Sequence, residues 1–168
     1  MRITIIGHAA SGKTTLAKKI SRKLDIPHIH LDRFWFESGG LDVQKGNNKK
    51  VEYVQGYIRN KVEDFIMQEN WVSDGFYSKV QPLIIDRADQ LIFIDIPLYT
   101  RIANHIKRVF RDERHQELNM WDEFLFIFEI IKRFFLKDAK YRKFIAQYPE
   151  KLLVLKSYKE VDAYLEGL

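Results

Sequence analysis

The chain has 168 residues, a formal net charge of +5 and no cysteine, a size that suits one globular domain with a sizeable core. The lack of cysteine excludes a disulfide framework and thiolate metal sites, and because no charged and then apolar leader opens the chain, we expect a cytoplasmic protein. The pI near 9.3 suits contact with a polyanion, which a phosphate substrate, a nucleic acid or an anionic membrane would provide equally well.

A strand, a glycine-rich loop and a helix are the first predicted elements. Residues 3–6 are a short apolar run rich in β-branched side chains, and apolar residues recur at helical spacing between residues 15 and 24. Between these segments, residues 7–14 read G-H-A-A-S-G-K-T, which matches the phosphate-binding pattern G-x-x-x-x-G-K-S/T in full. This context predicts a protein that binds a nucleoside triphosphate.

The residue types of this loop explain how it would hold phosphate. Glycines at positions 7 and 12 let backbone N–H groups approach an anion, and the helix that follows adds the positive end of its dipole. Lys13 is expected to reach the β- and γ-phosphates, and the Thr14 hydroxyl to coordinate Mg²⁺. The residues expected to contact the nucleotide are Gly7, Ala9, Ala10, Ser11, Gly12, Lys13, Thr14 and Thr15.

The next segment contains a short strand, an irregular stretch and a helix. Residues 25–30 predict the strand, and Asp32 is expected in the loop that follows it. Residues 33–48 carry an aromatic group, Phe34 to Phe36, and are expected to be irregular, with the aromatic rings either packed under the loop or stacked on a planar acceptor. Apolar positions at three- and four-residue steps predict one helix over 50–69.

The remaining chain continues the alternation of strand and helix. Strands are predicted at 71–75, 91–95 and 151–155, and helices at 79–88, 99–111, 121–148 and from residue 158 onward. Strands that are continuous apolar runs, each followed by a helix, indicate a parallel sheet with helices on both faces. We therefore expect a single three-layer α/β domain over residues 1–168.

Three carboxylates are expected at the carboxyl ends of the strands, where such sheets bind their ligands. They are Asp32, Asp74 and Asp95. A phosphoryl-transfer site needs a carboxylate near Mg²⁺. On pattern alone, Asp95 fits this role better than Asp74, because the strand before it is more apolar.

Four motifs follow one another along the chain: the phosphate loop, Asp74-Gly75-Phe76, Ile94-Asp95-Ile96-Pro97 and Lys107-Arg108. In this order they resemble the adenylate-kinase-like family of nucleotide and small-metabolite kinases. A longer match runs through His30-Leu31-Asp32, residues 71–77 and Leu153-Val154-Leu155, and it resembles the small P-loop proteins labelled DNA topology modulation proteins. The resemblance implies the P-loop NTPase fold with a five-stranded parallel sheet, an acceptor-side segment over 33–70 and a helical lid over 108–142. It also implies a kinase that uses ATP and Mg²⁺.

The family resemblance also implies roles for single residues. Asp74 would lie beside Mg²⁺ with Thr14, while Asp95 would mainly fix the geometry between strand and loop, which reverses the preference from pattern alone. Asp32, nineteen residues after Lys13, would orient or deprotonate an acceptor hydroxyl with help from His30. The residues themselves leave an alternative open, in which Asp32 is the N-cap of a following turn.

Basic residues lie on and just beyond the helix at 99–111, and as a group they are expected to contact phosphate. They are Arg101, Lys107, Arg108, Arg111 and Arg114, and Arg142 would close from the opposite side. Arginines that reach the γ-phosphate would stabilise the charge of the transition state. Among them, Arg108 and Arg111 are the first candidates for catalytic residues.

One departure from the family pattern leaves the acceptor open. Adenylate kinases carry Asp-Gly-Phe-Pro-Arg after the third strand, where the arginine grips the acceptor phosphate. This chain reads Asp-Gly-Phe-Tyr77-Ser78 at that place. Arg33 and Lys79 are candidate replacements for the missing cation.

Residues 121–136 are unusually apolar, although charged residues interrupt the run and make it too short to span a bilayer. Apolar side chains cover more than one face of this predicted helix, so one face would pack on the sheet and the other needs a cover. A folded lid, a second copy of the chain in a homodimer or an anionic membrane surface would each supply one.

The leading hypothesis is a Mg²⁺-dependent phosphotransferase that uses ATP and acts on a nucleotide, a nucleoside or a small metabolite. Its expected catalytic residues are Lys13, Asp32, Asp74, Arg108 and Arg111. The alternative is an ATP-dependent nucleic-acid-associated regulator without kinase turnover, although the sequence contains no known nucleic-acid-reading motif. A GTP switch is a third reading, but the string at 60–63 that comes nearest to its guanine motif ends in glutamate and lies in the wrong helix.

Overall fold

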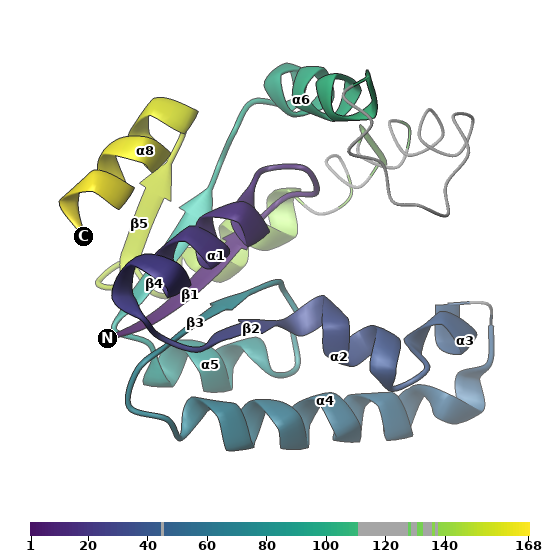
Figure 1. Ribbon diagram of the computed structural model, residues 1–168. Coiled ribbons are helices and arrows are strands. Elements are labelled where there is room, and N and C mark those ends of the chain that lie inside the picture. The colour runs from purple at the N-terminus through teal and green to yellow at the C-terminus, as the bar shows by residue number, and fades with distance from the viewer. Residues whose placement is uncertain (45, 111–127, 129–130, 133–135, 137) are drawn as a thin grey trace. The chain divides into compact units, whose positions relative to one another are not determined.

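The computed structural model describes residues 1–44, 46–110, 128, 131–132, 136 and 138–168. Strands and helices alternate along the chain (Figure 1). The strands form one five-stranded sheet in the order β2-β3-β1-β4-β5, which confirms the predicted α/β fold with its five-stranded parallel sheet. They are β1 (Arg2–Gly7), β2 (His28–His30), β3 (Trp71–Asp74), β4 (Gln90–Ile94) and β5 (Leu152–Leu155).

The helices lie close to most of their predicted positions. They are α1 (Lys13–Leu24), α2 (Leu31–Glu37), α3 (Gly40–Gln44), the 3-10 turn η1 (Asn48–Lys50), α4 (Val51–Ile66), α5 (Gln81–Arg87), α6 (Leu98–Phe110) and α8 (Tyr158–Gly167). The predicted helices at 50–69, 79–88 and 99–111 correspond to α4, α5 and α6. The described residues between 128 and 145 are also helical, within the helix predicted at 121–148.

The prediction of an irregular segment at 33–48 is wrong, because α2 and α3 occupy most of it. Leu31, Phe34 and Trp35 recur at steps of three and four residues, which places them on one face of a helix. Leu31 is fully buried, and Phe34 and Trp35 pack against the same hydrophobic cluster. The burial of this face favours a helix over a loop, and it assigns a packing role to two of the three aromatic residues. Phe36, the third, is 58% exposed.

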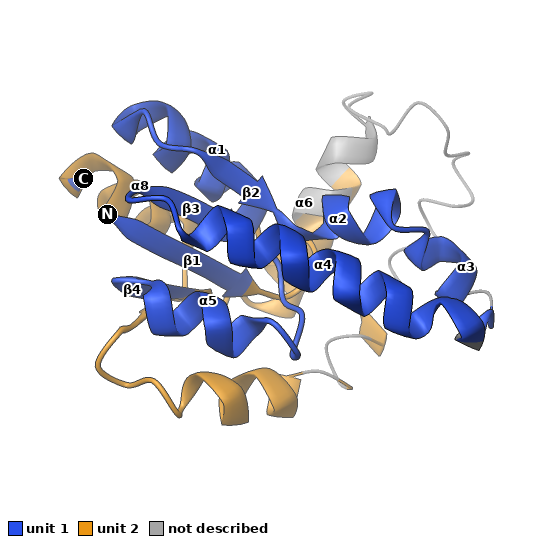
Figure 2. Ribbon diagram, turned by 90° about the horizontal axis from the view of Figure 1, so that it is seen from below, with its two compact units in different colours: residues 1–6, 13–92, 168 blue, residues 7–12, 93–167 orange. Residues whose placement is uncertain are grey.

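The described chain divides into two compact units (Figure 2). The first unit comprises residues 1–6, 13–92 and 168, and the second unit comprises residues 7–12 and 93–167. Most of the phosphate loop therefore belongs to the second unit, while the helix that directly follows the loop belongs to the first.

In the first unit, β3 is the central strand, and it pairs in parallel with both β1 and β2. All four of its residues are buried. Figure 1 shows α4 and α5 below β3 and α1 above it. The buried face of α4 packs in one cluster with Trp71 of β3, through Val54, Ile58, Val62 and Ile66. The register of β2 against β3 places His30 opposite Asp74, so both side chains emerge at the carboxyl ends of their strands.

In the second unit, the N–H of Asp95, the residue after β4, donates a hydrogen bond of 2.8 Å to the carbonyl oxygen of Leu155, the last residue of β5. The ring of His8 packs against Phe93 and Tyr141, with ring centroids 6.2 and 5.0 Å apart. Phe93 is fully buried and Tyr141 nearly so. Residues 7–12 therefore share a core with β4 and with the helical segment 138–145.

Candidate functional site

The phosphate loop turns through two residues with positive φ. These are Ala10, at 59°, and Gly12, at 91°. A Cβ at Gly7 would lie 2.7 Å from Ser11 Oγ and 3.0 Å from the carbonyl oxygen of Ile94, so the turn requires glycine at position 7. Ser11 Oγ is buried and has no hydrogen-bond partner among the described residues. A tight turn that holds an unused buried polar atom fits a phosphate group, because phosphate accepts hydrogen bonds from such loops.

A buried arginine holds the loop backbone. Arg101 is fully buried, and it donates from Nε to the carbonyl oxygen of Ile96 at 3.0 Å and from Nη1 to that of Ala9 at 3.2 Å. A rigid guanidinium fork can bridge two carbonyl groups in this way. The sequence groups Arg101 with the cations expected to contact phosphate, and the structure shows its side chain hydrogen-bonded to the backbone at the phosphate loop.

His8 of the loop begins a chain of polar contacts in the second unit. Its Nε2 lies 2.9 Å from Asp138 Oδ1. Arg142 donates from Nε to Asp138 Oδ2 at 2.8 Å and from Nη2 to both carboxylate oxygens of Asp95 at 3.1 Å. Burial lowers the pKa of His8 despite the hydrogen bond to Asp138, so the ring is neutral at neutral pH. Burial opposes ionisation of Asp138, but hydrogen bonds from Arg142 and His8 outweigh it and lower its pKa.

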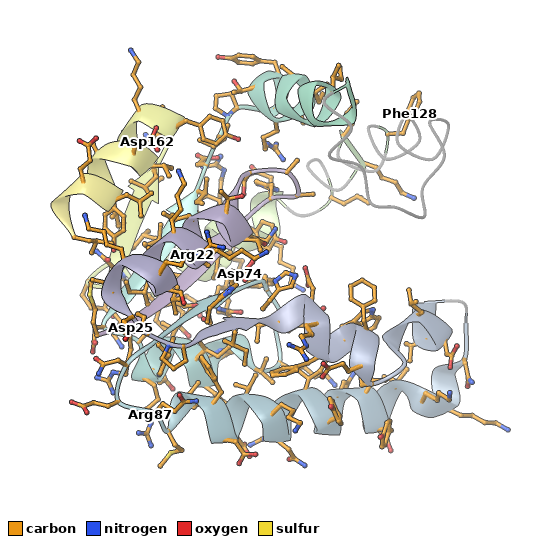
Figure 3. The ribbon with its side chains drawn as sticks, viewed as in Figure 1. Arg22, Asp25, Asp74, Arg87, Phe128 and Asp162 are labelled. Carbon is orange, nitrogen blue, oxygen red and sulfur yellow. The ribbon has the colours of Figure 1, made fainter. Side chains whose placement is uncertain are left out.

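Asp74 is a fully buried carboxylate at the end of β3, labelled in Figure 3. Thr14 Oγ1 donates to its Oδ2 at 2.6 Å, while His28 Nε2 and His30 Nδ1 lie 2.7 and 3.0 Å from its Oδ1. Burial alone would raise the pKa of Asp74. The hydrogen bonds from His28, His30 and Thr14 outweigh burial and hold the pKa well below its usual range, so the carboxylate is ionised.

The pair of Thr14 and Asp74 fits a Mg²⁺ site by its chemistry. Mg²⁺ prefers oxygen ligands and is usually held by one or two carboxylates together with substrate phosphates. Here a hydroxyl and an ionised carboxylate meet at the start of the helix that follows the phosphate loop. In the described part of the chain, no group of three His, Asp or Glu side chains could hold a metal by itself. This arrangement suits an ion that shares the nucleotide phosphates as ligands.

Asp32 lies in the first turn of α2, after the N-cap residue His30, so the alternative that Asp32 is itself the N-cap is wrong. The Tyr77 hydroxyl donates to Asp32 Oδ1 at 3.0 Å. His30 Nε2 lies 3.9 Å from Asp32 Oδ2. Because the Asp32 side chain remains 44% exposed, its carboxylate is accessible to an acceptor molecule.

The imidazole of His30 lies between the carboxylates of Asp74 and Asp32. Its Nδ1 contacts Asp74 at 3.0 Å, and its Nε2 approaches Asp32. The hydrogen bond to Asp74 raises the pKa of His30 and outweighs the opposing effect of burial. The structure therefore joins Thr14, Asp74, His30 and Asp32 in one polar group, which brings together four of the residues singled out from the sequence.

Two members of this polar group were not among the residues expected in the site. His28 contacts Asp74, and Tyr77 contacts Asp32. The signal for His28 is present in the sequence, because residues two apart on a strand face the same side, so His28 accompanies His30. Nothing comparable marks Tyr77, whose position depends on the path of the chain after β3.

The predicted lid lies largely outside the described residues. Arg108 belongs to α6, but only its backbone is described, and Arg111 lies outside the described residues. Of the apolar segment at 121–136, residues 128, 131–132 and 136 are described, and Phe128, labelled in Figure 3, and Leu136 are 71% and 69% exposed. None of the helices that the structure describes is long and apolar enough to cross a membrane.

Several known proteins with a similar sequence or fold are shikimate kinases. No protein-family model matches the chain. It is 25% identical over 130 residues to the shikimate kinase of Bacteroides fragilis, which covers 70% of this chain and 72% of that protein. The crystal structure of shikimate kinase from Bacteroides thetaiotaomicron matches with a TM-score of 0.56 and 17% identity over 99% of this chain and 95% of that one. Shikimate kinase from Acinetobacter baumannii, in complex with shikimate, matches with a TM-score of 0.58 and 12% identity over 98% and 89%.

The structural matches identify the fold as that of the P-loop kinases, in agreement with the resemblance drawn from the motifs. The sequence relatives support a kinase. ATP and Mg²⁺ are the cofactors of such an enzyme.

Proposed function

We propose that the chain transfers the γ-phosphoryl group of ATP to a hydroxyl group of a small metabolite. The observation that carries the proposal is the position of His30, which contacts the buried carboxylate of Asp74 and approaches the half-exposed carboxylate of Asp32. A carboxylate suited to Mg²⁺ and a carboxylate suited to an acceptor hydroxyl are thus parts of one polar group. The relatives named shikimate kinase support a small metabolite as the acceptor class.

Each residue of the site would have a defined task. Lys13 and the loop N–H groups bind the phosphates, and Thr14 and Asp74 hold Mg²⁺. When bound, Mg²⁺ neutralises charge on the β- and γ-phosphate oxygens. Asp32 accepts the proton of the acceptor hydroxyl as the new O–P bond forms and the bond from γ-phosphorus to the ADP oxygen breaks. Arg108 and Arg111 would stabilise the negative charge on the transferred group.

The cations on the acceptor side support a hydroxyl-bearing metabolite over a nucleoside monophosphate. Ser78 stands where adenylate kinases carry an arginine. Of the two candidate replacements, Arg33 pairs with Glu37 of its own helix at 2.6 Å, and Lys79 contacts Gln55 of α4 at 2.5 Å. Both cations thus have side-chain partners, Arg33 within α2 and Lys79 on α4, whereas Asp32 is accessible. Shikimate is the first acceptor to test, because the relatives are shikimate kinases.

A product assay tests the proposal. The purified protein is incubated with ATP, Mg²⁺ and one acceptor at a time, beginning with shikimate and continuing with sugars, nucleosides and nucleoside monophosphates, and the phosphorylated product is detected by mass spectrometry. We expect product from at least one hydroxyl acceptor, and none with the Lys13→Ala variant, whose thermal unfolding serves as a check of its fold. If no acceptor gives more product than the Lys13→Ala background, the proposal is wrong.

The nucleic-acid-regulator hypothesis makes a different prediction for the same preparation. It requires ATP-dependent binding of duplex DNA that weakens steeply as salt rises, with no phosphorylated small molecule. A gel-shift titration at several salt concentrations distinguishes the two functions. Thermal-shift measurements with ATP and with GTP distinguish a kinase that prefers ATP from a GTP switch.

A further inference from the structure

We propose that Tyr77 is a positioning residue that holds the Asp32 carboxylate in the orientation needed for phosphoryl transfer. This inference rests on the proposed function, in which Asp32 acts on the acceptor hydroxyl. The hydroxyl of Tyr77 donates a hydrogen bond of 3.0 Å to Asp32 Oδ1, from a residue that lies 45 positions further along the chain. On the other side, Asp32 Oδ2 lies 3.9 Å from His30 Nε2. The two oxygens of Asp32 thus have different neighbours.

Tyr77 is itself held in place by its ring and its backbone. The ring lies 6.1 Å from that of Trp35 and packs against the cluster that contains Leu31. Its carbonyl oxygen accepts hydrogen bonds from the N–H groups of Val80 and Gln81, at 3.0 and 2.9 Å, where α5 begins. Burial, together with the charge of Asp32, raises the pKa of Tyr77 above its usual range, so the hydroxyl keeps its proton and remains a donor.

A close approach of two backbone segments brings Tyr77 to Asp32. Gly75 has φ of 117°, and a Cβ there would lie 3.0 Å from the Cβ of Leu31. Leu31 is fully buried and directly precedes Asp32. The loop after β3 therefore passes against the start of α2, and this contact sets the path of the chain that leads to Tyr77.

The exposure of Asp32 explains why such a partner matters. At 44% exposure, a carboxylate without a fixed donor exchanges between rotamers in solvent, which costs entropy when one rotamer must be selected. A general base must lie within about 2.6–3.2 Å of the hydroxyl that it deprotonates, and a displacement of about 1 Å can lower a rate about a hundredfold. In the proposed reaction Asp32 acts on the acceptor hydroxyl and Tyr77 bonds to Asp32, so the effect of Tyr77 would pass through Asp32.

The variant Tyr77→Phe tests the inference, because it removes the hydroxyl and keeps the packed ring. Tyr57→Phe is a matched control, since the hydroxyl of Tyr57 also donates to a carboxylate, that of Glu37 at the end of α2, in an exposed hydrogen bond of 3.4 Å. On the acceptor that the wild type phosphorylates, we expect Tyr77→Phe to lower kcat about ten- to hundredfold with an unchanged KM for ATP. Tyr57→Phe should leave both constants unchanged.

A double variant separates positioning from a general structural role. If Tyr77 acts only through Asp32, then Tyr77→Phe combined with Asp32→Asn should be no slower than Asp32→Asn alone. Multiplicative losses in the double variant, or a Tyr77→Phe rate within about twofold of the wild type, would overturn the inference. Urea unfolding of each variant verifies that the fold is kept.

Crystal structures test the role of Tyr77 without a substrate, so a failure of the proposed function can be told apart from a failure of this inference. If the wild type phosphorylates no acceptor, the proposed function is wrong, and crystal structures of the wild type and Tyr77→Phe then decide the role of Tyr77. A changed side-chain rotamer of Asp32 in the variant supports positioning by the tyrosine hydroxyl. An identical Asp32 rotamer in both crystals contradicts it.

Discussion

The ring of His8, in the phosphate loop, contacts the carboxylate of Asp138 at 2.9 Å, although 130 positions separate the two residues in the sequence. The ring is buried, with 2% of the residue exposed. The charged groups that act on it are Arg101, Asp138 and Asp95. This contact links the phosphate loop to the helical segment at 138–145. One of its two partners, His8, is a titratable group.

We expect His8 to make the fold less stable in acid. The pKa of His8 is lowered in the folded protein, mainly by burial, so the unfolded chain binds the proton more readily. Its contribution to the free energy of unfolding is therefore present above the ordinary histidine pKa of about 6.5 and is lost as the pH falls below it. Urea unfolding from pH 8 to 5.5 should show a steeper loss of stability for the wild type than for His8→Gln, which keeps a donor but cannot titrate.

The difference between the wild type and His8→Gln cancels the contributions of the other titrating groups, which both proteins contain. His30, whose pKa is raised by Asp74, contributes stability below about pH 6.5 that is lost as the pH rises through its folded pKa, and it is present in both proteins. Asp138 titrates well below this pH window. Parallel pH profiles for the wild type and His8→Gln would contradict the prediction.

The choice between the two strand-end aspartates can be tested with matched substitutions. Asp74→Asn removes the charge of the buried carboxylate that contacts Thr14, so we expect Mg²⁺-dependent turnover to fall about a hundredfold or more. Asp95→Asn changes a carboxylate that pairs with Arg142, and its turnover should fall much less. Steady-state kinetics across a Mg²⁺ titration provide the measurement. Equal losses of turnover in both variants would contradict the assignment of the Mg²⁺ role to Asp74 over Asp95.

Arg101 is expected to stabilise the fold as well as the loop. Arg101→Met removes the donors to the carbonyl groups of Ile96 and Ala9, and leaving buried carbonyls unpaired should cost about 2–4 kcal/mol of unfolding free energy. The affinity for ATP should fall as well, because Ala9 lies in the phosphate loop. Arg59→Ala, which breaks an exposed pair with Glu63 on α4, should change stability by about 0.5 kcal/mol or less. Chemical denaturation and calorimetric titration with ATP measure the two effects.

Substitution by alanine should lower the stability of the protein at Gly75 and raise it at Gly56. Gly75→Ala places a Cβ at φ of 117° and 3.0 Å from Leu31, so we expect a loss of about 1–3 kcal/mol from backbone strain. Gly56 lies inside α4, and a Cβ there would meet nothing within 4 Å, so Gly56→Ala should raise stability by about 0.5–1 kcal/mol. Thermal unfolding of both variants is the measurement. A neutral Gly75→Ala variant would show that the loop after β3 can move away from α2.

The order of strands and helices was largely predictable, because buried parallel strands and amphipathic helices leave periodic patterns in the sequence. The phosphate loop was predictable for another reason, since its function depends on residue types at fixed spacing. Asp74 and Asp32 follow from their places at strand ends, once the family resemblance ranks Asp74 above Asp95. Each of these features depends on residues that are close together in the sequence, so a short stretch of sequence is enough to predict it.

Features that depend on contacts between distant segments were not predictable in the same way. Arg101 carries the same charge as its neighbours on α6, and only the approach of Ala9 shows that it faces the loop. The helical path of α2 depends on the core against which Phe34 and Trp35 pack. The bond between Tyr77 and Asp32 requires a close contact between Gly75 and Leu31 that no periodic pattern encodes.

The three-residue strand β2 aligns both histidines of the polar group with Asp74. Its pairing sets His28 beside Val72 and His30 beside Asp74, and because strand side chains alternate, a shift by one residue would turn both imidazoles to the other face of the sheet. A single insertion or deletion in the short connection before β2 would therefore detach both histidines from Asp74 in one step. Length changes among homologues should accordingly be rare at residues 25–27 and more frequent in the exposed turn near residue 46.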